Sequence, residues 1–179
     1  MHSINRYLQQ ADTLRFKLLG IVGKEPRKKD KIIAYLKKKG WTVVDVAKEL
    51  LPKKSEIDDA GDDSDFELGI KIKDWFNYQP NNLILTNASI LYHEIFLRIS
   101  PVGTFKYNSR NKNCLIFLED ESPLGARLYY GDMGSKEYYN QEMNDVLIVN
   151  IADISDEEQE YRPIRQRMSS DSKGVMRLC

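Results

Sequence analysis

Glycine and lysine residues between positions 23 and 29 have part of the spacing of a phosphate-binding loop. Such a loop follows a buried strand and consists of a glycine, four variable residues, a second glycine, a lysine, and a serine or threonine that opens a helix. The glycines let backbone N–H groups approach phosphate oxygens, the lysine neutralises them, and the hydroxyl binds Mg²⁺. Counted from Gly23, Lys29 has the position of that lysine, and the apolar run 16–22 has the position of the strand.

Two residues of this loop depart from the pattern. Lys28 replaces the second glycine, and its side chain would crowd the backbone path that holds phosphate. Asp30 replaces the serine or threonine and adds negative charge at a helix N-terminus, where an anion would have to bind. Taken alone, the segment is interpreted as an ordinary strand–loop–helix junction with a solvated basic loop.

The acid expected on the magnesium side of such a site is also missing. The apolar run 83–85 is followed by Thr86 and Asn87, without a carboxylate. Asn87 can still form a hydrogen bond, although asparagine at this place is more often a turn residue. The sequence therefore predicts degenerate Walker motifs, no catalytic residue, no metal and no resident cofactor, with ATP the one cofactor left open. The residues assigned to this degenerate nucleotide site are Gly23, Lys28, Lys29, Asp30 and Asn87.

Charge is distributed unevenly along the chain, although the formal net charge is zero. Residues 24–39 contain eight Lys or Arg residues and two acids. The candidates for contact with nucleic acid or a partner protein are Lys24, Arg27, Lys28, Lys31, Lys37, Lys38 and Lys39. A charge run on a helix is usually a solvated face, and this loop has little aromatic content to stack bases.

A third group is acidic: Glu119, Asp120 and Glu121 follow the apolar run 115–118. At the carboxyl ends of parallel strands such residues can line a ligand crevice, although a solvated acidic turn is commoner.

Short apolar blocks that alternate with helical periodicity predict the elements that position these residues. Strands are expected at 16–22, 41–46, 83–86, 113–118 and 146–151, with a hairpin edge at 128–130. Helices are expected at 4–14, 30–39, 66–79, 90–99 and 135–141. Asp30 is expected to be the N-cap or a first-turn acid of the second helix, and Pro101 to close the fourth. This order predicts an α/β, three-layer domain with a mostly parallel sheet. The domain spans 1–153 with an acidic loop at about 55–65, and 154–179 is a polar tail.

Four segments together resemble a known family. They are the runs 18–23, 82–87 and 111–118, and the stretch 128–138 with its Tyr-Gly-Asp-x-Gly pattern. The region from Leu14 to Ile151 resembles BrxF, the small P-loop-containing component of some bacterial BREX phage-defence systems. The resemblance implies a P-loop NTPase-like fold, a role in antiviral defence, and partners among the large ATPase, methyltransferase and phosphatase-like subunits. Family members are expected to carry an intact Walker A loop and an acid after the third strand, and this chain departs at Lys28, Asp30 and Thr86.

The leading hypothesis is a non-catalytic accessory subunit that docks onto a larger defence complex, a pseudo-NTPase rather than an enzyme. Two alternatives stay open: a weak nucleotide-binding switch that uses Gly23 and Lys29, and a DNA-contacting module that uses the basic segment 24–39. No apolar run has the length of a membrane span, so a cytoplasmic protein without a membrane partner is expected. The sequence leaves the homo-oligomeric state open.

Overall fold

A computed structural model of the chain describes residues 2–58, 64–136, 138–143 and 145–155. Its centre is a five-stranded parallel sheet. The strands are β1 (Leu18–Val22), β2 (Thr42–Asp45), β3 (Asn82–Thr86), β4 (Asn113–Leu118) and β8 (Leu147–Asn150), in the spatial order β2-β3-β4-β1-β8. Each neighbouring pair is parallel. The α/β class with a mostly parallel sheet is therefore confirmed.

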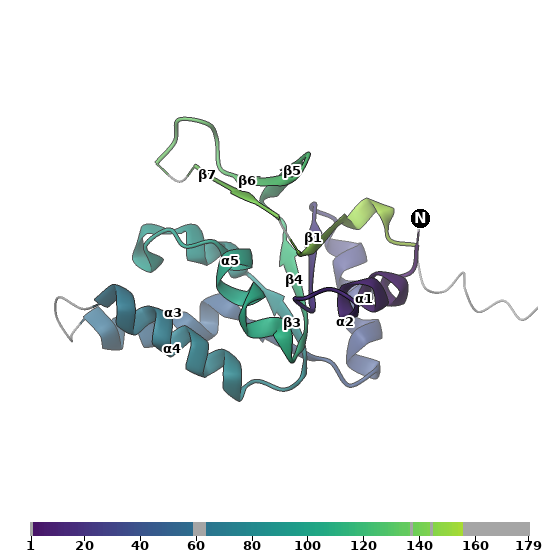
Figure 1. The fold of residues 1–179 in the computed structure, drawn as a ribbon, viewed down its shortest axis with the longest axis horizontal. Coiled ribbons are helices and arrows are strands. Elements are labelled where there is room, and N and C mark those ends of the chain that lie inside the picture. Colours follow the sequence, from purple (N-terminus) through teal and green to yellow (C-terminus); the bar gives the residue numbers. More distant parts are fainter. Residues whose placement is uncertain (1, 59–63, 137, 144, 156–179) are drawn as a thin grey trace, which may run out of the picture.

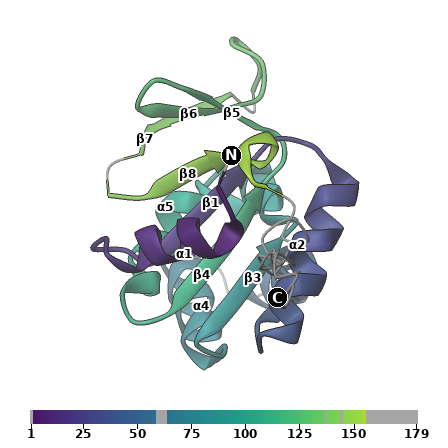
Figure 2. The same cartoon turned by 90° about the vertical axis from the view of Figure 1, so that its right-hand side faces the viewer.

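Helices cover both faces of this sheet, so the domain has three layers (Figures 1 and 2). On one face lie α1 (Ile4–Asp12) and α2 (Pro26–Lys38), and on the other α3 (Val46–Asp58), α4 (Ser64–Tyr78) and α5 (Pro101–Lys106). Side chains alternate between the two sides along β1: Leu19 and Ile21 pack toward α1 and α2, whereas Leu18 and Val22 pack toward the opposite helices. Burial on both faces explains why the central strands are continuous apolar runs.

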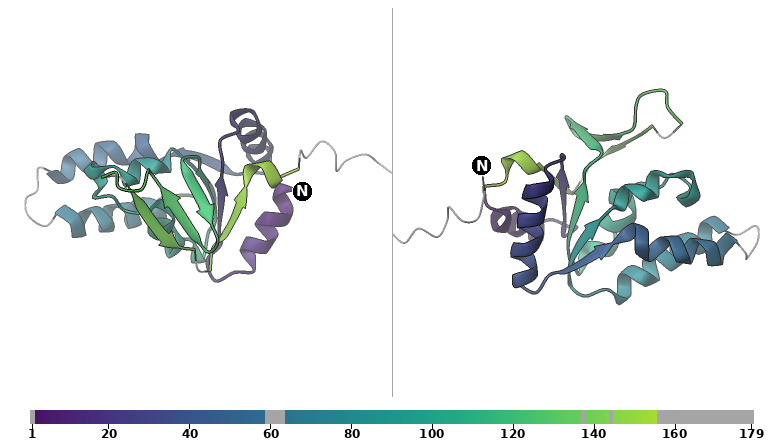
Figure 3. Two further views of the ribbon diagram at one scale, coloured as in Figure 1. Left: turned by 90° about the horizontal axis from the view of Figure 1, so that it is seen from above. Right: turned by 180° about the vertical axis from the view of Figure 1, so that it is seen from behind.

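A second, antiparallel sheet lies between β4 and β8 in the chain and projects from one end of the parallel sheet (Figures 1 and 3). Its strands are β5 (Glu121–Leu124), β6 (Arg127–Tyr130) and β7 (Tyr139–Glu142), in that order. Tyr130 stacks on Tyr92 of the main body with ring centroids 4.0 Å apart. This aromatic contact is part of what holds the small sheet in place.

The start of α2 and the region after β3 differ from the predictions. The second helix begins at Pro26 and is preceded by Glu25, so Asp30 lies inside the helix instead of capping it. Residues 90–99 do not form one helix: two short 3-10 helices, η1 (Ala88–Tyr92) and η2 (Glu94–Phe96), occupy this region. Leu97 and Arg98 have positive φ angles, which a right-handed helix excludes. Pro101 opens α5 instead of closing a helix.

Two further predictions are wrong. The described residues of 135–141 do not form the predicted helix, and 139–141 belong to β7, which pairs with β6. No helix is predicted between residues 46 and 66, yet α3 runs through 46–58 with Pro52 inside it. Val46 and Leu50 are buried against the sheet, and this packing outweighs the local cost of the proline.

The acidic stretch predicted as a loop at about 55–65 is helical where the structure describes it. Residues 55–58 and 64–65 are helical, and 59–63 lie outside the described residues. Most of the predicted tail, 156–179, also lies outside them.

Candidate functional site

The carboxyl ends of the parallel strands form the edge where the predicted site residues meet. After β1 the chain turns into α2 on one face of the sheet, whereas after β2 it enters the helices of the opposite face. β1 and β4 are adjacent in the sheet but not in sequence, which makes their carboxyl ends a topological switch point. Ligand crevices in open α/β sheets form at such points.

Gly23 ends β1 with a φ of +99°. A Cβ atom built there would lie 3.1 Å from Ile151 Cγ2 and 3.2 Å from Asn150 Oδ1. Both the positive φ angle and the close approach of Asn150 and Ile151 therefore require glycine. The backbone angle and the steric contact together explain why position 23 is glycine, without reference to a phosphate.

Lys29 reaches across the edge of the sheet to the residue that follows β4. Its Nζ lies 2.6 Å from Glu119 Oε2, and the two side chains are only 16% and 22% exposed. The Lys29 ammonium also lies 5.3 Å from the centroid of the Phe117 ring. The lysine that would neutralise phosphate is thus already paired with a carboxylate, and this carboxylate would repel a phosphate in the same place.

Two further lysines of the loop contact the same acidic turn and the short 3-10 turn that follows β8. Lys24 Nζ lies 3.4 Å from Asp120 Oδ1, and Lys28 Nζ donates to the carbonyl oxygen of Ala152 at 3.2 Å. A hollow of about 650 Å³ remains beside this loop. Its lining residues are Lys24, Glu25, Pro26, Arg27, Lys28 and Lys31.

The remaining basic candidates lie elsewhere. Lys37, Lys38 and Lys39 are at the far end of α2, whose 13 residues span about 20 Å. Lys39 Nζ donates to Asn5 Oδ1 of α1 at 3.0 Å and lies over the Tyr35 ring. The basic segment 24–39 is therefore two separate patches, one at each end of a helix.

Asn87 lies at the same edge as Gly23 but is separated from it by the width of β4, about 10 Å from strand β3 to strand β1. It adopts a left-handed conformation with φ 54° and donates from Nδ2 to Asp45 Oδ2 at 2.9 Å. Asp45 Oδ1 also accepts the backbone N–H of Lys48 in the first turn of α3. Hydrogen bonds from Asn87 and from the Lys48 amide thus meet on the Asp45 carboxylate and stabilise the turns after β3 and β2. The sequence analysis did not single out Asp45, although it is an acidic residue at the end of a strand.

Sequence reasoning also missed the environment of Glu121. This residue is 4% exposed, and within the described part of the chain neither carboxyl oxygen has a hydrogen-bond partner. Burial raises the pKa of Glu121 to about 8, and the negative charge of Asp120 adds to the rise. The raised pKa favours the protonated form of the Glu121 carboxyl group at neutral pH.

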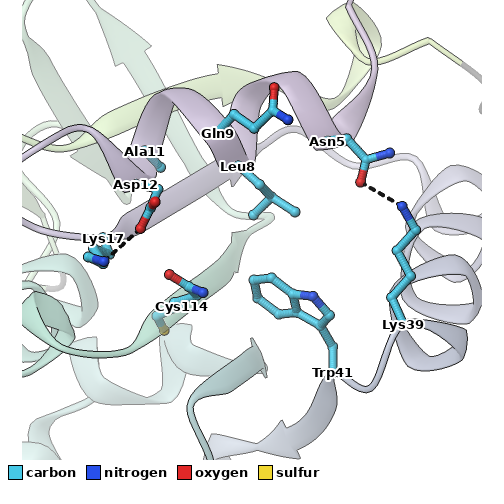
Figure 4. Close-up of a pocket in the computed structure, with 10 residues that line it drawn as sticks. Asn5, Leu8, Gln9, Ala11, Asp12, Lys17, Lys39, Trp41 and Cys114 are labelled. Carbon is cyan, nitrogen blue, oxygen red and sulfur yellow. Dashed lines mark hydrogen bonds and ion pairs between the residues drawn. The ribbon is translucent and has the colours of Figure 1, made fainter.

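A separate pocket of about 470 Å³ lies at the opposite, amino-terminal edge of the sheet (Figure 4). Inside the pocket, the side chain of Leu8 on α1 points toward the indole ring of Trp41. At its ends, Lys17 pairs with Asp12 at 2.7 Å and Lys39 bonds to Asn5. Cys114 forms part of the floor, and burial raises the pKa of its thiol.

No protein-family model, curated protein or solved structure matches this chain. Within the described ranges, the structure has no helix that is both long and apolar enough to cross a membrane. The same residues include no cluster of three or more His, Cys, Asp or Glu side chains placed to hold a metal ion.

Proposed function

We propose that this chain is a non-catalytic accessory subunit with a P-loop-NTPase-like scaffold, which docks onto larger proteins of a bacterial antiviral assembly of the BREX kind. The observation that carries the non-catalytic part is the 2.6 Å contact between Lys29 and Glu119. ATP would have to break this partly buried ion pair and then bind beside the released carboxylate. Asp30 and Thr86 offer no replacement for the groups that position Mg²⁺ in phosphoryl transfer.

The P-loop-like part of the proposal is supported by the place of β1. This strand is flanked on both sides, and the turn after it begins a helix at a switch point, as in dinucleotide- and phosphate-binding α/β domains. The proposed partners are the ATPase, methyltransferase or phosphatase-like subunits of such an assembly, which follow from the family resemblance. The hollow beside Arg27 and Lys31 is the proposed docking face, because its lining is rich in cations and open to solvent.

The absence of catalysis is tested with ATP and Mg²⁺. We expect no ATP turnover, and no binding of a fluorescent ATP analogue, by the purified protein or by Lys29→Ala. Glu119→Gln removes the competing negative charge and frees Lys29, so it is the variant most favourable to nucleotide. Turnover that survives purification and disappears in Lys29→Ala would contradict the proposal.

Docking is tested by purifying the tagged protein from its native host. Replacement of Lys24, Arg27, Lys28 and Lys31 by Glu is expected to loosen the complex. Replacement of Lys37 and Lys38 by Glu at the other end of α2 is the control, and it is compared with replacement of Lys24 and Arg27 alone, which reverses the same number of charges. If the four residues instead contact duplex DNA, the isolated protein will bind the duplex. The logarithm of the binding constant should then fall with the logarithm of the salt concentration with a slope of about −3.6, because each neutralised phosphate releases counterion. Tight, salt-sensitive duplex binding that the four substitutions abolish would replace docking by a DNA-contacting role.

A further inference from the structure

Three cationic side chains gather around one aromatic ring at the amino-terminal edge of the parallel sheet. The Cζ atoms of Arg15 and Arg110 each lie 5.4 Å from the centroid of the Phe16 ring, and Lys106 Nζ lies 5.7 Å from it. Arg15 and Phe16 precede β1, whereas Lys106 and Arg110 belong to the segment that precedes β4. Since β1 and β4 are neighbours in the sheet, the two segments meet.

These cations are not neutralised within the described residues, where no carboxylate forms an ion pair with Arg15, Lys106 or Arg110. The neighbouring Lys17 is different, because it pairs with Asp12. The loop after β1 is different too, because acids pair with two of its lysines. Three like charges around one ring repel each other and attract an anion. The unpaired positive charge of this fold therefore includes a cluster outside the basic run 24–39.

Tyr107 adds an exposed aromatic ring to the cluster. Its side chain is 58% exposed, and its ring packs edge-on against Phe16 with centroids 5.2 Å apart. Lys106 Nζ lies 4.9 Å from the centroid of the Tyr107 ring. Phe16 is only 2% exposed and serves as the fixed base of the cluster. Tyr107 is thus held against Phe16, with Lys106 over its ring, while more than half of its side chain stays exposed to a stacking partner.

We propose that this surface, formed by Arg15, Lys106, Tyr107 and Arg110, binds single-stranded nucleic acid. Cations that contact the phosphates, combined with an aromatic side chain that stacks on a base, are the two components of sequence-tolerant single-strand binding. A duplex would satisfy the cations but not Tyr107, because its base faces are stacked inside the helix. An acidic peptide would likewise leave Tyr107 without a stacking partner. This proposal is independent of the proposed docking function, because it concerns the opposite edge of the sheet.

The test is fluorescence anisotropy with a labelled oligothymidylate of about 15 nucleotides, the upper range for one small binding module. Tyr107→Ala is expected to weaken binding at least about five-fold without changing the salt slope, since it removes a stacked base. Tyr107→Phe keeps the ring and is expected to bind like the wild type. Replacement of Arg15, Lys106 and Arg110 by Gln is expected to reduce the log–log salt slope by about 2, because each single-strand phosphate contact contributes about 0.7.

The matched control replaces Lys24, Arg27 and Lys28 by Gln, which removes as much charge from the opposite edge. It is expected to leave both the affinity and the salt slope unchanged. Thermal unfolding of each variant checks that the fold is intact. Absence of oligothymidylate binding would overturn the proposal. So would equally tight binding of a duplex, or a Tyr107→Ala variant that binds oligothymidylate as tightly as the wild type does. Displacement of the strand by polyglutamate irrespective of Tyr107 would assign the surface to an acidic protein segment instead.

Discussion

Lys29 has a structural role that its contacts define. Its ion pair with Glu119 joins the start of α2 to the end of β4, two segments that are far apart in the sequence. Because both side chains are mostly buried, either one left alone would carry charge without its partner. The residue that most suggests nucleotide binding in the sequence therefore stabilises the junction between two strand ends.

Glu121 gives the molecule a pH dependence that can be measured. Its pKa rises from 4.5 to about 8 on folding, mainly because burial disfavours the ionised form. Below pH 4.5 both the folded and the unfolded states bind the proton, and between 4.5 and about 8 only the folded state does. Unfolding then releases a proton, so the free energy of unfolding falls as the pH rises through this window and levels off above it.

Glu121→Gln removes this titration while keeping the shape of the side chain. Relative to the wild type, the variant is expected to gain stability between pH 5 and pH 8, by a total of a few kcal/mol at about 1.4 kcal/mol per pKa unit. Chemical denaturation at several pH values measures the difference. A wild-type-minus-variant difference that stays constant with pH would show that Glu121 ionises freely in the folded state.

At the scale of elements, the C-terminus of α4 is closed by one side chain from outside the helix. Lys112, just before β4, donates from Nζ to the carbonyl oxygens of Phe76 and Asn77 at 2.9 and 2.7 Å, and to that of Gln79. Phe76 and Asn77 belong to the last turn of α4, whose carbonyls have no i+4 partner within the helix, and Gln79 is the first residue after the helix. A cation there also offsets the negative end of the helix dipole.

Lys112→Met is expected to lower the free energy of unfolding by about 1–3 kcal/mol, because the carbonyls lose charged hydrogen bonds. Amide exchange should accelerate mainly in the last turn of α4. Lys73→Met, on the exposed side of the same helix, is the matched control and is expected to change little. Equal effects of the two substitutions would mean that Lys112 does not cap the helix.

The central strands were predictable because burial on both faces leaves a continuous apolar run, as in 16–22. The region 88–99 was not, because its apolar spacing resembles a helix while Leu97 and Arg98 adopt left-handed conformations. The candidate site was predicted only in parts. The sequence identified Lys29 and the acids 119–121 as separate groups, but only the order of the strands makes Lys29 and Glu119 neighbours. The surface around Tyr107 escaped notice because its cations come from two distant segments.

At the scale of the whole molecule, two bodies of different size are joined through aromatic rings. Tyr92 of the main body stacks on Tyr130 and lies 5.4 Å, between ring centroids, from Tyr139. A small three-stranded sheet has little core of its own and depends on such contacts. The antiparallel sheet is therefore expected to open more readily than the parallel one.

Tyr130→Ala is expected to increase amide exchange throughout β5, β6 and β7 while leaving β1 and β4 protected, because it removes the stacking contact but no part of the main core. Tyr129→Ala, the adjacent residue on β6, faces the opposite side and pairs with Tyr138 instead. It serves as the matched control and is expected to leave the small sheet docked. Loss of protection in both sheets together would show that the two bodies unfold as one unit.

The strand order also bears on how the chain folds as it leaves the ribosome. β1 is made before both of its partners, and about 90 residues separate it from β4, the nearer of the two in sequence. During synthesis β1, whose five residues are all buried in the folded protein, therefore remains an unpaired apolar segment until β4 emerges. Pairing across such sequence separations is slow and exposes the nascent chain to aggregation. Ribosome-bound chains that stop before β4 should accordingly recruit chaperones that bind apolar segments, whereas chains extended beyond β8 should be released from them.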